Sequence, residues 1–130
     1  MTYVINTLRL KMKIVAISVN NNNNISDHFG YSEKFIIYQI NNNQITNKTV
    51  LKNPGHQPGS IPDYLNQNGV NVIICGGIGL SAIKLFNQCQ IEVISGIKGD
   101  YDKVISDYLS GSLVSDNQAC QEHMHQDEHH

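Results

Sequence analysis

Apolar residues occur along the chain in five short runs that are rich in isoleucine and valine. β-Branched residues favour extended structure, and short apolar runs bounded by polar or glycine-containing stretches are typical of strands. The sequence therefore predicts five strands, which cover residues 13–19, 34–40, 44–52, 70–75 and 91–95. The triplet Asn41 to Asn43 separates the second strand from the third and predicts a hairpin turn between them.

Three further stretches have apolar residues at helical spacing, and they cover residues 61–68, 80–88 and 101–109. Ser60 and Asp100 can cap the N-termini of the first and last helix, and Gly69 and Gly111 can end them. The predicted order is β-β-β-α-β-α-β-α. Right-handed crossovers in its α/β units would place helices on both faces of a mixed sheet, which is an α/β fold.

The chain has 130 residues, which fits one domain. Met12 opens the first clean strand pattern, so we expect residues 1–11 to be a disordered N-terminal extension and Met12 to be the natural start. Residues 12–113 then form a single α/β domain. Residues 114–130 are polar and are predicted to be a flexible tail rich in cysteine and histidine.

Composition excludes several classes of function. The formal net charge is −2 and Arg9 is the only arginine, so the clustered positive charge that nucleic-acid binding requires is missing. No apolar run approaches the roughly 20 residues that a membrane-spanning helix needs. The cysteines Cys75, Cys89 and Cys120 are odd in number and widely spaced, which is unlike a disulfide framework. Without a secretion signal, we expect a cytoplasmic location.

The C-terminal tail has the densest group of metal-binding side chains. Cys120, His123, His125, His129 and His130 lie within eleven residues. Thiolate and imidazole together suit zinc, copper and iron, and a single turn could bring the i, i+3 pair Cys120 and His123 onto one metal. The alternatives are a solvated acidic, histidine-rich tail or the remnant of an expression tag.

Two loops carry further histidines. His28 follows the first strand and precedes Phe29 and Gly30, and loops beyond the carboxyl ends of strands form ligand crevices in α/β sheets. Gly30 would allow a ligand to approach the backbone closely. His56 lies in a proline- and glycine-rich loop that leads into a helix N-terminus, where anions are favoured. The alternative for both histidines is an ordinary loop residue that faces water.

A glycine-rich segment, Gly76-Gly77-Ile78-Gly79, follows the fourth strand and opens a helix. Its backbone N–H groups could bind an anion, such as a phosphate, a carboxylate or a sulfide-rich cluster. It lacks the Lys-Ser/Thr of a P-loop and is not a dinucleotide fingerprint. The alternative is tight packing between strand and helix.

No catalytic motif emerges. The sequence has no Gly-x-Ser-x-Gly elbow, and its acidic residues are scattered over loops and helix starts rather than converging from strands. We therefore expect the protein not to be an enzyme.

Several segments in the same order resemble the dinitrogenase iron–molybdenum cofactor biosynthesis family, which contains NifX-type nitrogenase accessory proteins and small stand-alone relatives. The matching segments are Met12–Ile17, Ile25–Gly30, Phe35–Tyr38, Asn53–His56, Ile61–Leu65, Gly76–Gly79, Ala82–Phe86 and Ile91–Val93. The resemblance implies a ribonuclease-H-like, three-layer α/β/α fold with a five-stranded mixed sheet. It also implies that the protein holds or carries an iron–molybdenum or iron–sulfur cluster, with His28 as the favoured ligand.

One departure from the family pattern concerns His56. Many relatives have a second histidine soon after this one, whereas Gln57, Pro58 and Gly59 follow it here. A site that depends on the second histidine would be incomplete.

The sequence thus predicts a non-catalytic carrier that exchanges its cluster with a donor or acceptor protein and is a monomer or weak dimer. The predicted cofactor-binding residues are His28, Phe29, Gly30, His56, Gly76, Gly77 and Gly79, and the predicted metal ligands are His28, Cys120, His123 and His125. The main alternative is a zinc- or nickel-binding regulatory or storage module that uses the tail alone. An enzyme built on a ribonuclease-H-like scaffold is a third and weaker alternative.

Overall fold

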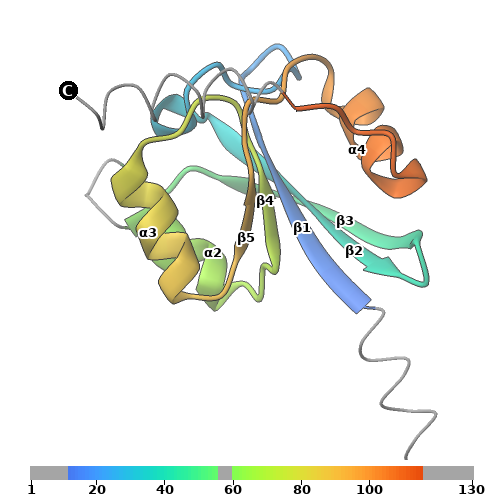
Figure 1. The fold of residues 1–130 in the computed structure, drawn as a ribbon, viewed down its shortest axis with the longest axis horizontal. Coiled ribbons are helices and arrows are strands. Elements are labelled where there is room, and N and C mark those ends of the chain that lie inside the picture. Colours follow the sequence, from blue (N-terminus) through green and yellow to red (C-terminus); the bar gives the residue numbers. More distant parts are fainter. Residues whose placement is uncertain (1–11, 56–59, 116–130) are drawn as a thin grey trace, which may run out of the picture.

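The computed structural model describes residues 12–55 and 60–115. The described elements follow one another as β1 (Met12–Val19), the 3₁₀ turn η1 (Phe29–Tyr31), β2 (Lys34–Asn41), β3 (Gln44–Lys52), α2 (Ser60–Gln67), β4 (Val72–Ile74), α3 (Leu80–Gln88), β5 (Glu92–Ile94) and α4 (Tyr101–Ser110) (Figure 1).

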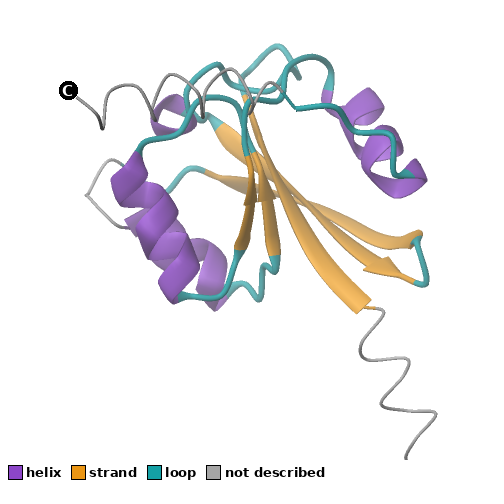
Figure 2. Ribbon diagram, viewed as in Figure 1, coloured by secondary structure: helices purple, strands orange, loops and turns teal. Residues whose placement is uncertain are grey.

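The strands form one five-stranded sheet in the order β3-β2-β1-β4-β5. β1, β2 and β3 pair antiparallel, whereas β4 is parallel to both β1 and β5. The sheet is therefore mixed, as predicted, with an antiparallel meander on one side and parallel strands on the other (Figure 2). Crossover helices join the parallel strands, because two parallel neighbours cannot be joined by a tight turn.

The turn between β2 and β3 confirms the predicted hairpin. Asn42 and Asn43 have φ angles of 53° and 65°, and Asn41 pairs with Gln44 across the turn. Two consecutive residues with positive φ give the turn a twist that matches the twist of the strands. Asparagine tolerates this conformation better than most residues, which explains why the hairpin turn is asparagine-rich.

Side chains from the two faces of the sheet build two cores. Val15 and Ile17 of β1 pack with Val104 of α4 on one face, and Ala16 packs with Phe86 of α3 on the other. Figure 1 shows α2 and α3 on one side of the sheet and α4 on the opposite side. In the described part of the chain, no helix is both long enough and apolar enough to cross a membrane.

Several elements differ in their boundaries from the prediction. β4 and β5 are three residues each, although Val70 and Cys75 beside β4 are buried. Their apolar runs are longer than their ladders, because burial continues where the backbone leaves the sheet. Ser60 begins α2 instead of capping it. The turn η1 was not predicted, because a three-residue 3₁₀ turn has no periodicity that a sequence pattern could reveal.

Candidate functional site

The carboxyl ends of β1, β4 and β5 lie at one edge of the sheet, and the loops that follow them are joined by backbone hydrogen bonds. Ile25 N–H donates to Gly99 O (2.8 Å), and Gly96 N–H donates to Gly76 O (3.0 Å). The loops after β1, β4 and β5 therefore form one connected surface, which we call the carboxyl edge.

The loop that carries His28 is held by the glycine-rich segment. Gly77 N–H donates to Asp27 O, and Phe29 N–H donates to Gly77 O, both at 2.7 Å. At Gly76, an added Cβ would overlap the carbonyl oxygen of Ser26 and lie 2.7 Å from Asp27 O. Only glycine allows so close an approach of the two backbones. Because the Gly77 N–H is used inside the protein, Gly77 is a backbone clamp rather than a free anion donor.

The turn η1 is anchored from beneath. The ring of Phe29 is 5% exposed and packs edge-on against Phe86 (5.4 Å between centroids, 75°). The buried hydroxyl of Ser32 donates to Phe29 O at 2.5 Å and contacts the hydroxyl of Ser18. Phe29, which was predicted to be part of the binding site, is therefore a core residue that fixes the backbone next to His28.

His28 itself is exposed on this fixed backbone. Its Nδ1 lies near Gly77, where an added Cβ would be 3.4 Å from this nitrogen. The ring of Tyr31 meets His28 nearly edge-on, with centroids 6.0 Å apart and planes at 76°. A neutral imidazole on an exposed residue can bind a metal through a ring nitrogen.

Tyr31 also borders a cavity of about 320 Å³, which is lined by Tyr31, Ser32, Glu33, Asn53 and Gly55. The Asn53 side chain holds this region together, because it donates to Ser32 O (2.7 Å) and accepts from Gly55 N–H (2.9 Å). His56 lies outside the described residues, but it is bonded directly to Gly55.

The remaining predicted residues fall into two groups. Gly30 and Gly79 are exposed, and an added Cβ would meet nothing within 4 Å at either position. Cys120, His123 and His125 lie outside the described residues. Within residues 12–55 and 60–115, no three histidine, cysteine or acidic side chains are grouped so that they could hold a metal ion. His28 is thus the one predicted metal ligand that the structure describes.

Cys75 is fully buried at the end of β4, directly before the glycine-rich segment. Burial raises the pKa of its thiol to about 12, so the thiolate that a metal would require does not form at neutral pH. Cys75 is therefore a small apolar core residue rather than a metal ligand.

Two features of the carboxyl edge could not be predicted from the sequence. Tyr31 is 75% exposed, which is unusual for so large an aromatic ring, but a single tyrosine three residues after a histidine is a weak signal. The clamp at Gly76 is a contact between segments about 50 residues apart, and no local pattern encodes it.

Comparison with known proteins decides the family. The family model described as "Dinitrogenase iron-molybdenum cofactor" matches residues 11–111. This chain belongs to the dinitrogenase iron–molybdenum cofactor family. The resemblance noted in the sequence is thereby confirmed.

Three further proteins are similar to this chain over most of its length. The protein MJ0580 of Methanocaldococcus jannaschii is 36% identical over 111 residues, which are 82% of this chain and 93% of that protein. The crystal structure of PH0822 is 31% identical, with a TM-score of 0.75 and coverage of 79% of this chain and 94% of that one. MJ0327, also from M. jannaschii, is 30% identical, with a TM-score of 0.64 and coverage of 80% and 93%.

Proposed function

We propose that this member of the iron–molybdenum cofactor family binds an iron–molybdenum or iron–sulfur cluster and carries it without catalysing a reaction. His28 would be the ligand from the folded domain, and Cys120, His123 and His125 would be ligands from the tail. The observation that supports this most directly is the position of His28, which is exposed on a clamped turn at the carboxyl edge. The assignment to the ribonuclease-H-like group is part of this proposal.

The path of the chain after α4 makes a shared site feasible. Ser115 is the last described residue before the tail, and its hydroxyl donates a hydrogen bond to Ser95 O, just beyond β5. From β5 to the loop after β1 is a step of two strands, or about 10 Å at the usual strand spacing. Cys120 is five residues after Ser115 in the sequence, and an extended chain of that length spans up to about 17 Å. Cys120 is therefore within reach of His28.

The chemistry of these donors suits a metal–sulfur cargo. Cysteine thiolate and histidine imidazole are soft to intermediate ligands that favour iron, zinc and copper over calcium or magnesium. His56 follows Gly55, which lines the cavity beside Tyr31, and we propose that this histidine contributes to the same site. Gly30 and Gly79 leave open space around it. We propose that the cluster passes to or from a donor or acceptor protein in the cytoplasm.

The test is reconstitution of the full chain with iron and sulfide under anaerobic conditions. The wild type and His28→Ala are compared by ultraviolet–visible spectra and metal analysis, with Gln67→Ala as a control at the opposite end of the sheet. We expect His28→Ala to lose most of the bound cluster while its circular dichroism spectrum and thermal midpoint stay unchanged. Equal cluster content in the wild type and His28→Ala would remove His28 from the site.

Deleting residues 118–130 distinguishes the carrier from a module that binds zinc or nickel through the tail alone. For the carrier we expect weakened binding that still depends on His28. Complete loss of metal, together with no effect of His28→Ala in the full chain, would favour the tail-only module.

A further inference from the structure

The chain does not leave the domain at the end of α4 but turns back toward the carboxyl edge. We infer that residues 111–115, which we call the return segment, are built to deliver the cysteine- and histidine-rich tail to His28, with Gly111 and Ser115 as its positioning residues. This inference deepens the proposed function. The return segment runs back from α4 to the end of β5 in Figure 1.

α4 starts and ends at different distances from the carboxyl edge. α4 begins at the carboxyl edge, where Asp100 caps it and Tyr101 N–H donates to Asn23 O in the loop after β1 (3.2 Å). Its ten residues then carry the chain about 15 Å away from that edge at the usual rise per residue. A tail that left directly from the end of α4 would therefore start far from His28.

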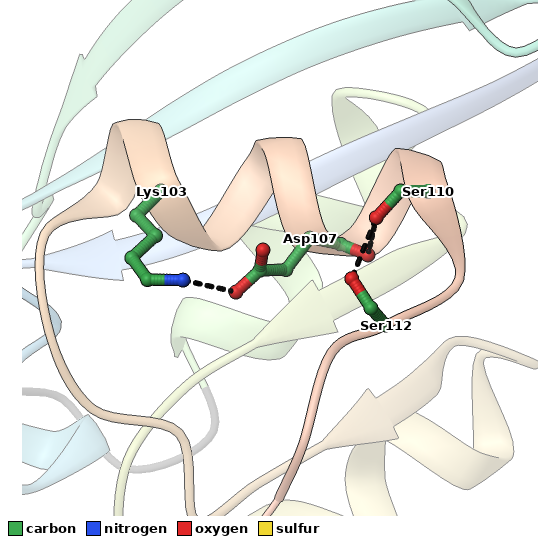
Figure 3. A network of polar contacts seen from close by, with 4 residues as sticks. All are labelled: Lys103, Asp107, Ser110 and Ser112. Carbon is green, nitrogen blue, oxygen red and sulfur yellow. Dashed lines mark hydrogen bonds and ion pairs between the residues drawn. The ribbon is translucent and has the colours of Figure 1, made fainter.

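The chain reverses its direction at the end of α4. Gly111 adopts the left-handed conformation (φ 78°), which glycine accepts at little cost, and Ser112 N–H donates to Asp107 O (2.9 Å). The hydroxyl of Ser110 donates to the same carbonyl and contacts the hydroxyl of Ser112 (Figure 3). These bonds turn the chain back on itself immediately after the helix.

Two contacts hold the far end of the return segment. Leu113 packs against the core that α4 covers, and the Ser115 hydroxyl donates to Ser95 O. Between these anchors and α4 lies a cavity of about 430 Å³, lined in part by Val104, Asp107 and Val114. The return segment is thus fixed mainly by its ends rather than by continuous packing along α4.

The return segment shortens the length of chain between the last anchored residue and Cys120. With the return segment in place, Cys120 is five residues beyond the anchor at Ser115, and a random coil of that length would have a root-mean-square span of about 12 Å. Without these anchors, Cys120 would be tethered nine residues beyond Gly111, at the distant end of α4, and a random coil of that length would span about 17 Å. The anchor therefore raises the local concentration of Cys120 around His28, and the concentration of a tethered group falls steeply as the tether lengthens.

The inference can be tested without metal, by the rate at which Cys120 forms a disulfide with an introduced cysteine. The full chain carries Cys89→Ser, and the buried Cys75 stays unreactive. One reporter is His28→Cys, and the matched control is Gln67→Cys at the end of α2, on the opposite edge of the sheet. Rates are measured with oxidised glutathione in the presence of a chelator, by mass spectrometry.

With the native return segment, we expect Cys120 to pair with position 28 at least about tenfold faster than with position 67. Replacing residues 112–115 by Ser-Gly-Ser-Gly keeps the tether length but removes both anchors, Leu113 and the Ser115 hydroxyl, and should lower this ratio at least about threefold. Ser115→Ala, which removes one hydrogen bond and leaves Leu113 in place, should lower it about twofold and remains informative if the larger replacement unfolds.

Equal rates at positions 28 and 67 in the native chain would overturn the inference, and so would a ratio that is the same in all three versions of the return segment. Because no metal is present, such a failure would leave cluster binding by His28 untouched. Conversely, a high ratio together with no cluster uptake would reject the proposed function and retain the return segment.

Discussion

At the scale of single residues, the carboxyl edge depends on two positions that lie next to each other in the chain. Gly76 lets the backbone after β4 approach the loop of His28, and Cys75 closes the core directly beneath it. Gly76 matters because it has no side chain, and Cys75 matters because its thiol is buried. Each gives a prediction that does not depend on the nature of the cargo.

Gly76→Ala should lower the free energy of unfolding by about 1–3 kcal/mol, because a Cβ there overlaps the Ser26 carbonyl and must push the two loops apart. It should also weaken cluster uptake by displacing His28. The matched control is Gly79→Ala, where a Cβ meets nothing and φ is −80°. We expect the control to be neutral or to gain up to about 1 kcal/mol in denaturant unfolding. Equal effects of the two substitutions would contradict the clamp.

Cys75 predicts how stability changes with pH. Burial raises the pKa of its thiol from 9.0 to about 12, so the folded state holds this proton more tightly than the unfolded state. The contribution to stability is complete below about pH 9 and is lost as the pH rises toward about 12. Burial also raises the pKa values of Tyr38 and Tyr108 from 10.0, so these two residues add to the loss only at higher pH.

The measurement is denaturant unfolding of the wild type and Cys75→Ala between pH 7 and 10.5. The free energy of unfolding of the wild type should begin to fall near pH 9, with a slope approaching about 1.4 kcal/mol per pH unit for this group. In Cys75→Ala the fall should begin about one pH unit higher. The same onset in both proteins would show that the Cys75 thiol is not protonated preferentially in the folded state.

At the scale of elements, sequence patterns predicted the strands and helices that bury a face, because burial imposes a period on apolar residues. The hairpin at Asn42 and Asn43 and the end of α4 at Gly111 were also predictable, since both turns require residues that accept positive φ. The turn η1 was not, because its position is set by distant partners. Phe29 is held by α3 through Phe86 and by the glycine-rich segment through Gly77.

The anchoring of η1 can be tested with two aromatic residues from the same turn. Phe29→Ala should cost about 3–5 kcal/mol of stability, because it empties a buried ring position between β2 and α3. Tyr31→Ala should change stability by less than about 0.5 kcal/mol, because its ring is mostly exposed. Thermal and denaturant unfolding measure both. A large loss in Tyr31→Ala would mean that the contact with His28 supports the fold rather than the site.

At the scale of the whole molecule, the mixed sheet places its parallel strands so that the loops after β1, β4 and β5 share one edge. The rule that ligands bind beyond the carboxyl ends of strands was enough to select His28 from the sequence. It could not select the return segment, because a chain that reverses after its last helix depends on long-range contacts such as Ser115 with Ser95. The domain and the start of its tail thus meet at the same edge.

The central claim is that His28 and the tail bind the same cluster. The most direct measurement is a double-mutant cycle with His28→Ala and Cys120→Ala, in which the dissociation constant of the reconstituted cluster is determined anaerobically for all four proteins. Ligands of one site are coupled, so we predict that each single substitution removes most of the affinity and that the double substitution costs much less than the sum of the two in free energy. Strictly additive effects would mean that the two residues act at separate sites, and would contradict the account.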